Sequence, residues 1–142
     1  IRLVDGGLQK RCFTYVEDGI DCLMKIIENP GGVADGKIFN IGNPDNEASV
    51  KDLADMLKKM FQEHPDHRHD EVYAEIIEVP HEEYYGQGYQ DIFTRKPSIA
   101  NAQKYLGWSP QTDLETSLKI TLDAFVEEAR IYDNQTAGQE LY

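Results

Sequence analysis

The sequence predicts a mixed α/β domain with about four helices and three or four short strands. Three stretches place apolar residues at helical spacing, several short apolar runs contain β-branched residues, and Gly- or Pro-containing breaks separate them. The chain has 142 residues, of which 40% are hydrophobic and 28% are charged. This length and this balance are typical of one globular domain with a buried core.

The chain is predicted to begin with a short strand at Ile1–Val4 and a turn at Asp5-Gly6-Gly7. A helix is predicted from Val16 to about Asn29, because Pro30-Gly31-Gly32 cannot continue it. The apolar stripe of this helix consists of Val16, Ile20, Leu23, Met24 and Ile27.

The next two elements are predicted as a strand and a long helix. The strand is Lys37–Ile41, and Gly42-Asn43-Pro44 ends it. Ser49 and Asp52 have the spacing of a capping box, with Asp in place of the usual Glu, and they predict the start of the helix. This helix should end near His64, and its apolar stripe consists of Val50, Leu53, Ala54, Leu57, Met60 and Phe61.

The last part of the chain is predicted to alternate loops with helices. Ala74–Val79 is predicted as a strand, His81–Thr94 as a loop rich in Tyr and Gly, and Ser98–Tyr105 as a short helix. Thr112 and Glu115 have capping-box spacing and predict the start of a final helix. Its inward-facing residues should be Leu114, Leu118, Leu122, Phe125 and Val126.

The charge of the chain excludes several classes of partner. The formal net charge is −12 at pH 7, from 26 acidic and 14 basic residues. A nucleic acid needs a basic face, and an anionic membrane surface repels such a chain, so we expect neither partner. No apolar run is as long as a membrane span. Cys12 and Cys22 are too few for a disulfide scaffold, and we expect both to be inert.

Several common site patterns are absent from the sequence. It contains no glycine-rich dinucleotide loop, no phosphate-binding P-loop, no Y-x-x-x-K pair and no C-x-x-C. His64, His67 and His69 lie close in sequence and His81 follows, but their polar neighbours predict a solvated loop instead of a metal site. The sequence therefore predicts neither a cofactor site nor a metal site within this chain.

Two groups of basic residues interrupt the acidic chain. One consists of Arg2, Lys10 and Arg11, and the other of Arg95 and Lys96. Arginine grips phosphate or carboxylate with two parallel hydrogen bonds, so these groups indicate a local anion site. Two ordinary salt-bridged patches would give the same pattern, and both interpretations stay open at this point.

Four strings carry a resemblance to a known family, namely D-G-G-L-Q-K-R, N-I-G-N-P-D-N-E, Y-Y-G-Q-G-Y-Q-D and R-K-P-S. The chain resembles the C-terminal part of extended short-chain dehydrogenase/reductases from Ile1 to about Val126. More narrowly, it is similar to the UDP-glucuronic acid decarboxylase domain of the bifunctional ArnA-type polymyxin-resistance enzymes. UDP-apiose/UDP-xylose synthases share the Y-G-x-G-Y motif and are the nearest alternative family.

The resemblance implies the substrate-binding portion of such an enzyme, without most of its Rossmann domain. Residues 1–132 would form the UDP-sugar-binding portion, and residues 133–142 a polar tail. In that family NAD oxidises the C4 hydroxyl of UDP-glucuronate to a ketone. The resulting β-keto acid loses CO₂, and protonation gives a UDP-4-keto-pentose for aminoarabinose modification of lipid A. NAD would be bound by the missing N-terminal half of the same protein.

The resemblance also implies site residues. The Asp5–Arg11 segment would lie along the UDP-sugar, with Arg11 at the diphosphate and with Gln9, Lys10 and the nearby Arg2 as further substrate-binding residues. Tyr89 matches a tyrosine that touches the substrate, and Arg95 matches the residue described as the proton donor. Because the pKa of arginine exceeds about 12, stabilisation of the developing enolate by Arg95 is the simpler role. Leu8 stands where the family often has Lys, which removes one positive charge.

The resemblance further implies a cytoplasmic location and a homo-oligomeric parent enzyme. The chain begins inside an apolar run, so we expect it to be part of a longer protein. The Val16–Ile27 helix face and the Lys37–Ile41 strand should then pack on the missing sheet, leaving an apolar patch bare here. The alternatives are another nucleotide-sugar epimerase or dehydratase, and a non-catalytic UDP-sugar-binding module.

Overall fold

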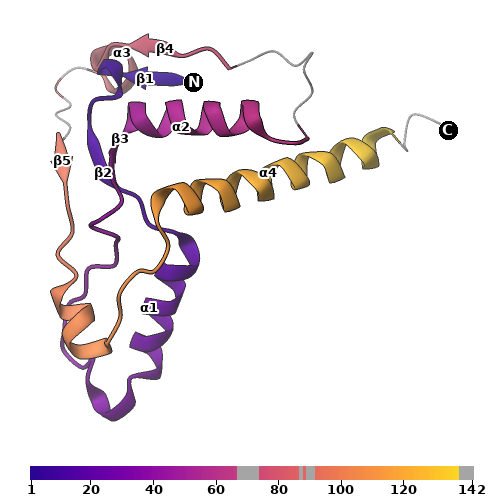
Figure 1. Ribbon diagram of the computed structural model, residues 1–142. Coiled ribbons are helices and arrows are strands. Elements are labelled where there is room, and N and C mark those ends of the chain that lie inside the picture. The colour runs from indigo at the N-terminus through magenta and orange to yellow at the C-terminus, as the bar shows by residue number, and fades with distance from the viewer. Residues whose placement is uncertain (67–73, 87, 89–91, 138–142) are drawn as a thin grey trace.

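The computed structural model describes residues 1–66, 74–86, 88 and 92–137. It confirms a mixed α/β fold. Figure 1 shows α2 between the β1–β4 pair and α4, while α1 extends away from this group beside the segment that follows β5. The helices are α1 (Val16–Glu28), α2 (Val50–Glu63), α3 (His81–Tyr85) and α4 (Leu114–Ala137). The strands are β1 (Arg2–Val4), β2 (Lys10–Cys12), β3 (Glu47–Ser49), β4 (Ile77–Val79) and β5 (Thr94–Arg95).

The strands form two small sheets. In one, β1 and β4 are parallel, with Arg2 opposite Ile77. In the other, β2 lies in the middle, antiparallel to β3 and parallel to β5. The predicted strand at Ala74–Val79 is confirmed over β4, whereas β2 and β3 were not predicted. The stretch expected to be an irregular loop, His81–Thr94, contains α3 and the start of β5.

The predicted start of α2 is confirmed. Ser49 Oγ accepts a hydrogen bond from the Asp52 N–H at 2.9 Å, and the Asp52 carboxylate accepts one from the Ser49 N–H at 3.1 Å. The glycine turn after β1 lies against this end of the helix. A Cβ on Gly7 would lie 3.0 Å from the backbone nitrogen of Lys51, and its φ of +66° favours glycine. The turn therefore fixes β1 against α2.

The best-packed core joins α1 to the segment that leads into α4. Trp108 is only 1% exposed, and it packs with the buried residues Cys22, Ile99 and Ala102. Its Nε1 donates a hydrogen bond to the Asp18 carbonyl at 3.1 Å. The Asp18 carboxylate accepts hydrogen bonds from the backbone N–H groups of Gln111 and Thr112. The α1 prediction is confirmed, and Asp18 ties its first turn to the distant end of the chain.

The predicted strand at Lys37–Ile41 is wrong, because the structure places no strand there. Its side chains alternate as in a strand, since Phe39 and Ile41 pack against the Trp108 core while Ile38 is 83% exposed. A strand also needs a neighbouring strand to pair with. Within the described residues, the Ile38 carbonyl instead accepts a hydrogen bond from the side-chain amide of Asn101 at 2.9 Å.

The α4 helix corrects two expectations. Asp113, and not Thr112, caps the helix, because its carboxylate accepts hydrogen bonds from the N–H and the hydroxyl of Thr116 at 2.8 and 3.0 Å. Phe125 is exposed instead of inward-facing, and its side chain lines an open apolar cavity together with residues of α2 such as Leu57 and Phe61. The helix continues to Ala137, beyond the predicted start of the polar tail.

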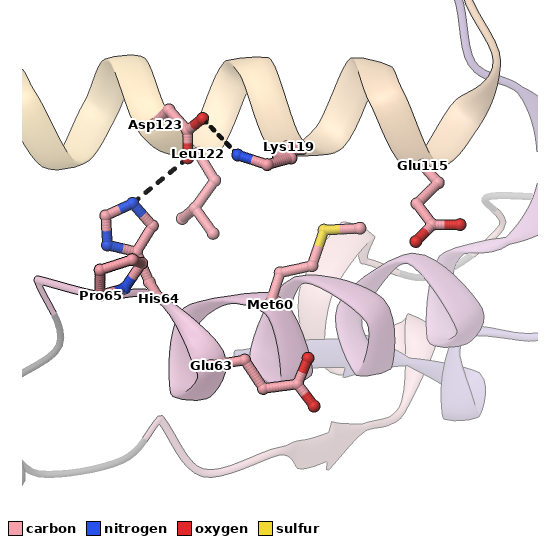
Figure 2. A pocket seen from close by; sticks show the side chains of 8 residues that line it. All are labelled: Met60, Glu63, His64, Pro65, Glu115, Lys119, Leu122 and Asp123. Atoms are coloured by element: carbon pink, nitrogen blue, oxygen red, sulfur yellow. Dashed lines mark hydrogen bonds and ion pairs between the residues drawn. The ribbon is translucent and has the colours of Figure 1, made fainter.

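The contact between α2 and α4 also corrects the expectation for one histidine. The side chain of His64 is only 12% exposed, and its Nε2 lies 3.2 Å from a carboxylate oxygen of Asp123. Figure 2 shows Lys119 reaching the same carboxylate, at 2.8 Å. His64 thus links the end of α2 to α4 instead of lying in a solvated loop. His81 pairs with Asp5 at 2.9 Å, while His67 and His69 lie outside the described residues.

A pH prediction follows from this contact. Hydrogen bonding to Lys119 and its positive charge, with His64 adding to both effects, hold the pKa of Asp123 below its ordinary value. A carboxyl whose pKa is depressed by folding stabilises the fold above its unfolded pKa of about 3.9, and that contribution is lost as pH falls. We expect the melting temperature of Asp123→Asn to fall less than that of the unsubstituted chain between pH 5 and pH 3. Asp21→Asn, which changes an exposed carboxylate on α1, is the control, and equal slopes for both variants would contradict the prediction.

Candidate functional site

The central strand β2 brings the two predicted arginines together. Arg11 lies directly opposite Arg95 in the parallel β2–β5 register. Residues opposite each other in a sheet point to the same face, and like charges in that position destabilise the pair. This arrangement is typical of a site that receives an anion.

A cleft of about 430 Å³ opens at this pair. Its lining residues are Arg11, Cys12, Asn40, Ile41, Gly42, Arg95, Lys96, Pro97 and Ser98. The wall opposite β2 depends on a close backbone approach, because a Cβ on Gly42 would lie 2.6 Å from Cγ of Pro97. Asn40 joins the same two segments through a hydrogen bond from its Nδ2 to the Ser98 carbonyl at 3.1 Å.

Arg11 also forms hydrogen bonds to the backbone around this site. Its Nη1 donates hydrogen bonds to the carbonyl of Ile92 at 2.8 Å and to that of Lys10 at 2.7 Å. The Lys10 N–H donates to the Phe93 carbonyl at 2.8 Å. These bonds hold the residues before β5 against β2. Arg11 therefore helps to place Arg95, and it lines the cleft as well.

The other predicted site residues lie elsewhere. Arg2 is in the β1–β4 sheet, opposite Ile77. Gln9 is half-buried, and its Nε2 donates to the Val4 carbonyl at 3.3 Å. Lys10 points away from Arg11 along the strand, and its charge acts on Asp52 at the start of α2. Tyr89 lies outside the described residues. A substrate-binding role for these four residues stays a prediction.

Three cleft residues were not predicted as site residues. Cys12 is half-buried next to Arg11, and burial, followed by the charge of Glu47, raises the pKa of its thiol. Lys96 was noted only as part of a basic group. Asn40 lies inside the stretch predicted as a strand. Only the N-I-G-N string pointed to the region of Asn40, and nothing in that string indicates that its side chain bonds to Ser98.

The asparagines of the same string have structural roles. Asn43 and Asn46 are buried, and each side-chain amide donates a hydrogen bond to the Thr112 carbonyl at 3.0 Å. The Asn43 N–H donates to Thr14 Oγ1. They anchor the chain before α4 and lie outside the lining of the cleft.

The described residues do not fit the pyrophosphate of a dinucleotide. Such a group needs free N–H groups at a helix start that follows a glycine-rich turn. At α2 and α4 these donors already serve Ser49 and Asp113, and hydrogen bonds from Thr116 lower the pKa of the Asp113 carboxyl. The α1 helix begins with Glu17 and Asp18. Among residues 1–66, 74–86, 88 and 92–137, no three potential metal ligands come together either.

An apolar stripe on α1 faces solvent, as expected. Its members, between 45% and 73% exposed, are Val16, Ile20, Leu23, Met24 and Ile27. The opposite side of the helix contributes Cys22 and Ile26 to the Trp108 core. Within the part of the chain that the structure describes, no helix is long and apolar enough to cross a bilayer.

No family model matches the chain. Among solved structures, it is similar to the PbgP3 protein from Burkholderia pseudomallei, with 44% identity and a TM-score of 0.70 over 84% of this chain and 32% of that chain. It is also similar to the UDP-glucuronic acid 4-epimerase from Bacillus cereus in complex with UDP-glucuronic acid and NAD, with 22% identity and a TM-score of 0.65 over 86% of this chain and 33% of that chain. The third is the UDP-glucose 4-epimerase with UDP-glucose from Thermotoga maritima, with 23% identity and a TM-score of 0.64 over 91% of this chain and 35% of that chain.

The chain thus spans about one third of the length of the solved structures that it matches. It has the α/β fold of part of an extended short-chain dehydrogenase/reductase, the fold that nucleotide-sugar dehydratases and epimerases share.

Proposed function

We propose that this chain is the UDP-sugar-binding part of an NAD-dependent UDP-glucuronate decarboxylase of the ArnA type. The observation that carries the proposal is the meeting of Arg11 and Arg95 on adjacent strands at one cleft. The 44% identity to the PbgP3 protein over most of this chain supports a close relationship to that protein, and the UDP-glucuronic acid bound to the Bacillus cereus epimerase, which has a similar fold, supports a nucleotide-sugar substrate. A cytoplasmic, homo-oligomeric enzyme that supplies aminoarabinose for lipid A is part of the same proposal.

The residues of this chain would bind and orient the substrate. Arg11 would pair with the diphosphate, and Arg95 would lie at the sugar. NAD, bound outside this chain, supplies the oxidising power for the C4 hydroxyl. Loss of CO₂ leaves negative charge on the sugar, and a guanidinium placed there stabilises it without first having to reorganise solvent.

The test uses the full-length protein that contains this chain, incubated with UDP-glucuronate and NAD. The expected products are CO₂ and a UDP-4-keto-pentose, whereas the 142-residue chain alone should give no turnover. Formation of UDP-galacturonate without CO₂ would show the alternative, an epimerase like the Bacillus cereus neighbour. Sustained CO₂ release by the isolated chain would contradict the proposal that this chain binds the substrate while NAD is bound outside it.

We also propose that the exposed stripe of α1 and the unpaired Lys37–Ile41 segment pack on the Rossmann half of the same protein. The stripe is continuous, and Ile38 extends the set of exposed apolar side chains. Exposed apolar patches of this kind are typical of interaction surfaces. The neighbouring segment has the alternation of a strand but lacks a strand partner among the described residues.

This second proposal predicts self-association of the isolated chain. Its sedimentation coefficient should rise with concentration in the micromolar range, because the bare stripe of one copy can cover that of another. Leu23→Glu should reduce the effect, while Ile120→Glu, which changes an exposed apolar residue outside this stripe, on α4, should leave it unchanged. A chain that stays monomeric at all concentrations would contradict the prediction.

A further inference from the structure

Lys96 belongs to the same cleft as Arg11 and Arg95. It follows Arg95 directly, it is exposed, and it lines the cleft. Within the described residues, no carboxylate lies within ion-pair distance of Lys96 or of Arg95, although Lys51, Lys119 and Arg130 all have such partners. The ammonium group of Lys96 is therefore available to a ligand.

Cys12 lines the same cleft as Lys96. The pKa of the Cys12 thiol is raised, first by burial and then by the nearby carboxylates Glu47 and Asp45, while the charge of Lys96 opposes them. In the sheet order β3–β2–β5, Glu47 belongs to β3 and Lys96 follows β5. Glu47 and Lys96 thus belong to segments on opposite sides of β2.

The backbone on both sides of Lys96 is fixed. Before it, Arg95 is paired with Arg11 in the β2–β5 ladder. After it, Pro97 lies so close to Gly42 that a Cβ there would be only 2.6 Å from the proline ring, and the Ser98 carbonyl accepts a hydrogen bond from Asn40. The position of residue 96 at the cleft therefore follows from the fold and not from side-chain mobility.

We propose that Lys96 is a specificity-determining residue that makes the cleft select a nucleotide sugar bearing an acidic sugar over one bearing a neutral sugar. This inference rests on the proposed function. A UDP-hexose carries two negative charges, both on the diphosphate, and a UDP-uronate carries a third on the sugar. In the proposed function Arg11 pairs with the diphosphate and Arg95 lies at the sugar, and Lys96, next to Arg95 in the chain and in the lining of the cleft, adds a second cation for the third charge.

The test compares the dissociation constants of UDP-glucuronate and UDP-glucose for the 142-residue chain and two variants at low ionic strength. The unsubstituted chain should prefer UDP-glucuronate by about tenfold, the scale of one charge pair near a protein surface. Lys96→Gln should remove most of this preference and leave UDP-glucose binding nearly unchanged. Lys59→Gln, which removes an equal charge from an exposed position on α2, should change neither constant.

Alkylation of Cys12 tests whether the nucleotide sugar binds in the cleft, because Cys12 lines it. Cys22 is fully buried and should not react. UDP-glucuronate should slow the reaction at pH 8 in the unsubstituted chain. Lys96→Gln should slow the alkylation of Cys12 even without ligand, because the cation that favours the thiolate is gone. This slower alkylation would also show that the variant keeps the local fold.

The remaining outcomes separate the two proposals. If Lys96→Gln weakens both ligands equally, Lys96 is a general anion contact and the specificity inference is overturned. If Lys96→Gln changes nothing while Arg11→Met and Arg95→Met weaken UDP-glucuronate, this inference fails and the proposed function stands. If the unsubstituted chain binds neither nucleotide sugar, both are overturned.

Discussion

Trp108→Ala should lower the free energy of unfolding of this chain by about 3–5 kcal/mol, the range found for large aromatic residues in packed cores. The indole is almost fully buried, and it is the largest residue of the core that joins α1 to the segment before α4. A domain of this size has a total stability of only about 5–15 kcal/mol. The variant should therefore be close to unfolding at 37 °C, which urea titration followed by circular dichroism would measure.

Two further variants divide this effect into its parts. Trp108→Phe keeps most of the ring but leaves the Asp18 carbonyl without its indole donor, so we expect a smaller loss of about 1–3 kcal/mol. Phe125→Ala removes an exposed ring from α4 and should change the stability by less than about 0.5 kcal/mol. A Trp108→Ala chain as stable as the Phe125→Ala chain would show that this core does not hold the fold together.

The long helices were the predictable part of this fold, because the signals that predict them lie close together in the sequence. The stripe of α1 and the Ser49–Asp52 box of α2 each lie within a few turns of one helix. The periodicity does not say which side an apolar stripe faces, however. On α1 the stripe faces solvent, and the core uses Cys22 and Ile26 instead. That choice depends on Trp108, far along the chain.

The strands were harder to predict for the same reason. Strand β2 is three residues long, too short to show alternation, and it exists because Arg11 pairs with Ala48 on one side and with Arg95 on the other. The opposite error occurred at Lys37–Ile41, where composition and alternation are those of a strand but no pairing partner lies within the described residues. Pairing, and not propensity, decides both cases.

The candidate site also depends on strand pairing that the sequence does not show. Composition pointed to Arg11 and Arg95 as members of two basic groups, and the family resemblance gave them roles. Neither could show that the two groups face one cleft, because this depends on the β2–β5 register. The hydrogen bond from Arg11 to the Ile92 carbonyl was also invisible in the sequence. This bond bears directly on how the two arginines can be distinguished by mutation.

Arg95→Met in the full-length protein should reduce kcat for UDP-glucuronate decarboxylation by at least about 100-fold, the scale measured for the loss of one donor to a developing negative charge. Methionine keeps much of the side-chain length and removes the charge. Arg95 forms no ion pair within the described residues, so its loss should leave the stability nearly unchanged. NAD binding should change little, because in the proposed function NAD binds outside this chain.

Arg11→Met should behave differently. The diphosphate keeps its charge throughout the reaction, so an interaction with it stabilises substrate and transition state alike, and its loss raises KM more than it lowers kcat. Arg11→Met also removes the bonds to the Lys10 and Ile92 carbonyls, so the melting temperature should fall as well. Arg95→Met should therefore act on kcat without an effect on stability, and Arg11→Met on KM together with stability. If Arg95→Met kept a near-normal kcat while Arg11→Met lost it at unchanged melting temperature, the two roles would be reversed and the assignment proposed here would be wrong.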